Sequence, residues 1–87
     1  MHAVVVRVKL DDEAAAQKAL QEEVVPQVSA APGFVTGYWT RKGDTGLSMI
    51  IFDSEEAATN ASERIGSGVP DSVTLEGVEV REVAAHA

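Results

Sequence analysis

The chain of 87 residues contains no cysteine and only two histidines, His2 and His86, one near each end. Disulfides and thiolate metal sites are therefore excluded, and we expect no metal and no other cofactor. A domain of this size buries a smaller share of its surface than a larger one does. Small domains usually gain stability from disulfides, metals or self-association. Self-association is the support that this composition leaves open.

Basic residues are also scarce, because 7 Lys and Arg stand against 14 Asp and Glu, for a net charge of −7. The only adjacent basic pair is Arg41-Lys42. Nucleic acid and anionic membrane surfaces are therefore not expected partners. No apolar run reaches the roughly 18 residues of a membrane span, and the N-terminus lacks a signal pattern. These features favour a cytoplasmic location.

The first third of the chain has the pattern of a strand followed by a helix. β-Branched residues at period two predict a strand over residues 1–10. Alanine-rich sequence then predicts a helix over residues 11–31, with Asp11 or Asp12 as its cap. Pro26 removes a helical hydrogen bond, so it predicts a kink or a break near that position.

Aromatic residues number only four, and two of them, Tyr38 and Trp39, are adjacent. They lie in the first of two β-rich runs, residues 34–40 and 47–52, which the turn residues of "RKGDTG" join into a hairpin with a longer loop. Neighbouring strand residues face opposite sides of a sheet. The predicted register places Tyr38 beside Met49 or Ile51. Trp39 then shares a face with Ser48, Ile50 and Phe52.

The last third predicts a second helix over residues 53–65, capped by Asp53 and ended by Gly66, and a strand over residues 73–83 that bulges at Gly77. The order βαββαβ predicts a single α+β domain over residues 1–87. Its ferredoxin-like fold has a four-stranded antiparallel sheet with both helices on one face. The other face is left bare and carries apolar residues, which favours pairing with a second copy.

The runs "VVVRVKL", "VVPQVSAAPGFVTGYW" and "GLSMIIFDSEEAA" resemble, in order, the dimeric α/β barrel superfamily and especially its antibiotic-biosynthesis-monooxygenase-like (ABM-like) branch. The resemblance implies a homodimer with a ligand pocket between each sheet and its own helices. It also implies a cofactor-independent monooxygenase acting on a small aromatic, quinol-like molecule. Heme-degrading members carry Asn and Trp where this chain has Val6 and Phe52, and a His that residues 53–65 lack. Heme degradation is therefore not expected.

Two sets of residues follow from the predicted faces and the resemblance. Trp39 and Phe52 are each open to two interpretations, pocket wall or core. Arg7 is expected to pair with a carboxylate, Glu79 or Glu82, on the bare face. The predicted pocket residues are Val6, Leu20, Val24, Trp39, Ile50 and Phe52, and the predicted dimer-interface residues are Val5, Arg7, Tyr38, Met49 and Ile51.

Three functions remain open at this point, and no catalytic residue is assigned. The chain is a monooxygenase, a non-catalytic small-molecule-binding dimer, or a structural dimer whose pocket is filled by side chains. The volume of the pocket distinguishes the first two from the third, because ligand sites have volumes of about 300 Å³ or more.

Overall fold

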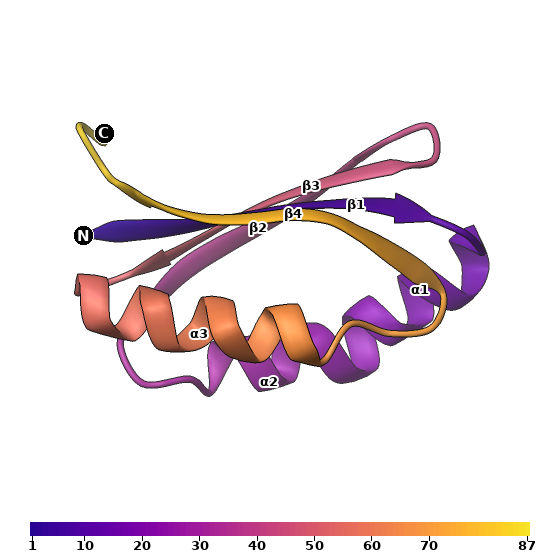
Figure 1. The fold of residues 1–87 in the computed structure, drawn as a ribbon, viewed down its shortest axis with the longest axis horizontal. Coiled ribbons are helices and arrows are strands. Elements are labelled where there is room, and N and C mark those ends of the chain that lie inside the picture. Colours follow the sequence, from indigo (N-terminus) through magenta and orange to yellow (C-terminus); the bar gives the residue numbers. More distant parts are fainter.

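The computed structural model describes all 87 residues and has the predicted order of strands and helices. All helical segments lie on one side of the sheet, and the other side is uncovered (Figure 1). The four strands form an antiparallel sheet in the order β2-β3-β1-β4. The elements are β1 (His2–Leu10), α1 (Glu13–Ala19), η1 (Leu20–Val24), α2 (Val25–Ser29), β2 (Phe34–Lys42), β3 (Thr45–Phe52), α3 (Glu55–Ser67) and β4 (Val73–Glu82).

The first helical region is interrupted, as predicted, but the irregularity begins before the proline. Residues Leu20–Val24 form a π-helical segment, in which the N–H of Val25 donates to the carbonyl of Leu20. Pro26 then lies in the first turn of α2. The backbone N–H groups of a first turn have no partner within their helix, so the N–H that proline lacks costs no helical hydrogen bond there. The wider π turn accommodates the proline, and the predicted helix over residues 11–31 is divided into the segments α1, η1 and α2. Asp12 is the cap, and its carboxylate accepts from the Ala15 N–H at 3.0 Å.

Both predicted ends of the second helix are wrong by one or two residues. Ser54 caps α3 in place of Asp53, because its extended backbone directs its hydroxyl to the Ala57 N–H at 3.1 Å. The helix continues through Gly66 and ends at Ser67, with Gly68 as its C-cap. The backbone N–H of Asp53 is used elsewhere and donates to the Gly33 carbonyl at 2.8 Å.

The β2–β3 hairpin is tighter than predicted, because both strands extend to a two-residue turn at Gly43-Asp44. Gly43 has a positive φ of 61°, which a turn with glycine in the first central position requires. The predicted register is confirmed, with Tyr38 opposite Met49 and Trp39 opposite Ser48. This register directs Trp39 to the helix side of the sheet.

The β1–β4 pairing contains the predicted bulge. The register shifts between Arg7, which pairs with Gly77, and Val8, which pairs with Leu75. Glu76 is thereby left without a partner on β1, and β4 bends at this point.

The core lies between the sheet and the helices, toward the end of the sheet where β3 leads into α3. Phe52 is fully buried there, and its ring meets Phe34 edge to face at 6.2 Å between centroids. Three buried strand residues, one residue of α2 and two alanines of α3 form the buried cluster with it. The buried cluster is Val4, Val6, Val28, Ile50, Phe52, Ala58 and Ala61.

The loop before β2 is joined to the start of α3 at Gly33. Its φ of +82° lies in the left-handed region that favours glycine. A Cβ atom at this position would lie 2.6 Å from Asp53 Oδ1 and 2.7 Å from the Ala57 Cβ. The glycine of "PGF" and the acid of "FDS" therefore lie next to each other in the fold.

We expect Gly33→Ala to lower the free energy of unfolding by at least about 1 kcal/mol, because the left-handed backbone is costly for alanine and two close contacts add to that cost. Gly66→Ala is the matched control. Nothing lies within 4 Å of a Cβ at Gly66, and the position is helical, so the change should stabilise by up to about 1 kcal/mol. Urea unfolding of both variants measures the difference; equal effects would contradict this account of Gly33.

Candidate functional site

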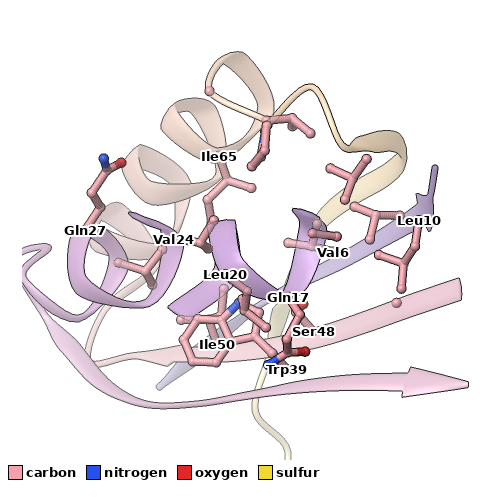
Figure 2. Close-up of a pocket in the computed structure, with 18 of the residues that line it drawn as sticks. Val6, Leu10, Gln17, Leu20, Val24, Gln27, Trp39, Ser48, Ile50 and Ile65 are labelled. Atoms are coloured by element: carbon pink, nitrogen blue, oxygen red, sulfur yellow. The ribbon is translucent and has the colours of Figure 1, made fainter. Parts of the chain in front are cut away.

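A cavity of about 580 Å³ lies between the sheet and the helical layer, toward the end of β1 that leads into α1. Strands β1, β2 and β3 provide its floor, and helical segments from α1 to α3 cover it (Figure 2). Residues 68–70, in the loop after α3, complete the wall. Of its 25 lining residues 15 are hydrophobic, so the cavity suits an apolar ligand better than a charged one.

Five of the six predicted pocket residues line this cavity, namely Val6, Leu20, Val24, Trp39 and Ile50. Phe52 does not line it, and its predicted place in the pocket is corrected. The α3 helix packs directly on Phe52 through the fully buried Ala58, which leaves no space beside the ring. The same sheet face is therefore packed at one end and open at the other.

Several lining residues were not predicted. Gln17 and Gln27 share the helical face of Leu20 and Val24, and a periodic reading of that face would have found them. Ser48 faces the helices, on the same side of β3 as Ile50. A polar residue at such an inward-facing position is the signal that could have identified it. No sequence pattern predicted that the loop residues Gly68, Val69 and Pro70 line the cavity, because their position depends on how α3 and β4 pack.

Charged side chains that line the cavity are partly exposed at its rim. Arg41 Nη1 lies 4.0 Å from Glu13 Oε2, and both side chains are about half exposed. Arg64, on α3, is also exposed and borders the cavity. Neither histidine lines it: His2 lies at the opposite end of β1, with Nε2 3.3 Å from Glu55 Oε2. The interior of the cavity is therefore formed by uncharged side chains.

Trp39 lines the cavity without filling it, and Gly37 explains why. The two residues face the same side of β2. A Cβ atom at Gly37 would lie 2.9 Å from Cη2 and 3.0 Å from Cζ3 of the indole. The six-membered ring of Trp39 therefore lies back along its own strand, over a position that has no side chain. This placement keeps the space between β2 and the helices open.

The face of the sheet opposite the helices carries all five predicted interface residues. Val5 pairs with Met49, which also pairs with Tyr38, and Arg7 and Ile51 share their side of the sheet. Tyr38 is 67% exposed and Met49 is 47% exposed, whereas Val5 is already buried within the single chain. Leu47, not predicted, adds a further exposed apolar side chain to this face.

Charged residues lie beside these apolar side chains. The predicted partner of Arg7 is confirmed as Glu79, with Arg7 Nη1 at 3.3 Å from Glu79 Oε1. Arg81 Nη2 approaches the same oxygen at 2.9 Å. The hydrogen bond from Arg81, with a further contribution from Arg7, lowers the pKa of the Glu79 carboxyl below its usual value. Two cations thus share one carboxylate at the β1–β4 side of the face.

Comparison with known proteins supports the fold. No protein-family model and no curated protein matches the sequence. MupZ from Pseudomonas fluorescens has a similar structure, with a TM-score of 0.70 and 16% identity over 91% of this chain. This chain spans 65% of the length of MupZ. A dimeric ferredoxin-like protein from an uncultured marine organism aligns with 100% of this chain and 98% of its own, with a TM-score of 0.66 and 14% identity.

At identities this low, the two neighbours establish the ferredoxin-like α+β fold alone. The predicted fold class is confirmed. No helix of the chain is both long enough and apolar enough to cross a membrane.

We expect Gly37→Ala to close part of the cavity. The added methyl group displaces the indole of Trp39, whose free direction is into the cavity. Trp39 is the only tryptophan, so its fluorescence emission should shift, and binding of an apolar fluorescent probe should fall. Gly66→Ala, remote from Trp39, is the control. An unchanged emission spectrum with unchanged probe binding would contradict the role assigned to Gly37.

Proposed function

We propose that the chain is a homodimer of the ABM-like branch of the dimeric α/β barrel superfamily and binds a small aromatic, quinol-like molecule between its sheet and helices. The observation that carries this proposal is the cavity of about 580 Å³. Its volume lies within the range of about 300 to 1,000 Å³ that small-molecule sites occupy. A structural dimer with a filled pocket would not need this space.

The walls of the cavity support an aromatic ligand. Apolar side chains from strands and helices provide most of the surface, and the indole of Trp39 offers a face or an edge for stacking. The few polar groups are uncharged amides and hydroxyls, with ionic groups confined to the rim. A flat ring system with one or two oxygen substituents satisfies this combination.

Cofactor-independent oxygenation is the activity that such a cavity supports best. A quinol and O₂ give a hydroxyquinone and water, so the ring supplies all four electrons that O₂ accepts. One oxygen atom joins a ring carbon and the other leaves in water. The protein then needs a dry pocket that positions the ring, and the apolar interior meets that need.

Binding and turnover are tested with one panel of naphthols and quinols. We expect saturable quenching of Trp39 fluorescence by members of the panel, and oxygen consumption with the quinols. Val24→Phe, in the cavity wall, should weaken binding at least tenfold because it occupies ligand space. Val35→Phe makes the same exchange at an exposed position outside the cavity and should change little.

Three outcomes of this experiment differ in meaning. Quenching without oxygen uptake above the uncatalysed rate leaves a binding protein and removes the monooxygenase. Equal effects of the two phenylalanine variants place the ligand outside the cavity. No quenching by any member of the panel overturns the proposed ligand class.

The homodimer is supported by the uncovered face of the sheet. Tyr38, Leu47 and Met49 are each about half exposed or more and lie on adjacent strands. A second sheet packed on this face would remove their apolar surface from water. The structural neighbour from a marine organism is itself described as a dimeric ferredoxin-like protein.

We expect sedimentation velocity at low micromolar concentration to show a dimer, and Met49→Glu to shift the equilibrium to monomer. The new carboxylate would be buried against a second apolar sheet without a partner. Thr59→Glu adds the same charge on the exposed side of α3 and should leave the dimer intact. A folded monomer for the unchanged chain would contradict the assembly.

A further inference from the structure

Ser48 is the one polar residue among the buried residues of the chain, and it is 8% exposed. It lies on β3 at the floor of the cavity, next to Ile50 on the same face (Figure 2). Its hydroxyl forms no hydrogen bond within the protein. The hydroxyl opens on the cavity, so it is available to a hydrogen-bonding group of a ligand that enters there.

A second open group lies directly across the strands, because Trp39 is the cross-strand partner of Ser48. Cζ3 of Trp39 rests over Gly37, and this atom lies across the six-membered ring from the carbon that bears Nε1. The N–H edge of the indole therefore points away from Gly37. It too forms no hydrogen bond within the protein.

We propose that Trp39 Nε1–H and Ser48 Oγ together bind one ring oxygen of the ligand, which makes them the residues that select an oxygenated aromatic over a plain hydrocarbon. This inference rests on the proposed function and deepens it. Directly opposed strand residues have Cβ atoms about 5 Å apart, which is close enough for one oxygen to reach both side chains.

The two groups define the chemistry of that oxygen. The indole N–H is a donor only, so the ligand oxygen must accept a hydrogen bond from it. The serine hydroxyl either donates or accepts. A phenolic hydroxyl accepts from Trp39 and donates to Ser48, and a quinone carbonyl accepts from both. The pair therefore holds the reduced and the oxidised form of one ring without any change of protonation in the protein.

Selectivity for an oxygenated ring follows from the free-energy cost of leaving the Trp39 N–H and the Ser48 hydroxyl without hydrogen-bond partners. A hydrocarbon of the same shape gains the same apolar contacts, but it displaces water from the two polar groups and leaves them without partners. An oxygenated ring meets both groups. The loss of either protein group should therefore weaken binding of the oxygenated ring and leave binding of the hydrocarbon unchanged or stronger.

The test uses 1-naphthol and naphthalene as probes that share one ring skeleton, with binding measured by isothermal titration calorimetry. The unchanged chain should prefer 1-naphthol, and Ser48→Ala should weaken 1-naphthol about tenfold while naphthalene is retained. Trp39→Phe keeps an aromatic ring but removes the N–H, and it should show the same selective loss. Ser62→Ala, whose hydroxyl bonds to the Thr59 carbonyl on α3, is the control.

The outcomes distinguish a failure of the polar pair from a failure of the proposed function. Equal weakening of both probes by Ser48→Ala, or no effect on either, overturns the assignment of the polar pair and leaves the cavity as a binding site. Absence of binding of both probes to the unchanged chain overturns the proposed function, and the polar pair falls with it. Thermal unfolding of each variant verifies that the fold is kept.

Discussion

The register between β2 and β3 is the constraint on which the rest of the structure depends. Trp39 and Tyr38 are neighbours, so a slip of one residue would exchange the faces that they occupy. The two-residue turn at Gly43 holds the strands in place, with Trp39 opposite Ser48 and Tyr38 opposite Met49. One short turn thus decides which aromatic residue meets the cavity and which meets the open face.

The helix side of the sheet is divided between packing and open space. At one end the ring of Phe52 is fully enclosed, and α3 lies against it through alanine side chains. At the other end Gly37 has no side chain and Ser48 has a small one, so this end of the sheet is not filled. A small domain has little apolar burial to spare, so an open cavity lowers its stability. Burial of the opposite face by a second copy would offset that cost.

The open face combines apolar side chains on β2 and β3 with a charged group on β1 and β4. Arg7 extends over Gly77, where a Cβ would lie 3.0 Å from its Nη2, and so lies along the sheet rather than standing out from it. Glu79 accepts from Arg7 and from Arg81. Because Glu79 already has two partners, its carboxylate would not be left unpaired when a second copy covers this face.

The sequence by itself determined the order of elements, the sheet faces and five of the residues that line the cavity, because alternation in strands and periodicity in helices are local properties of the chain. Tertiary structure alone decided the cap at Ser54 and the open end of the cavity. These depend on contacts between distant segments: Asp53 is drawn to Gly33, and Trp39 lies back over Gly37. Spacing predicts which way a side chain points, but the space in front of it depends on how the helices dock.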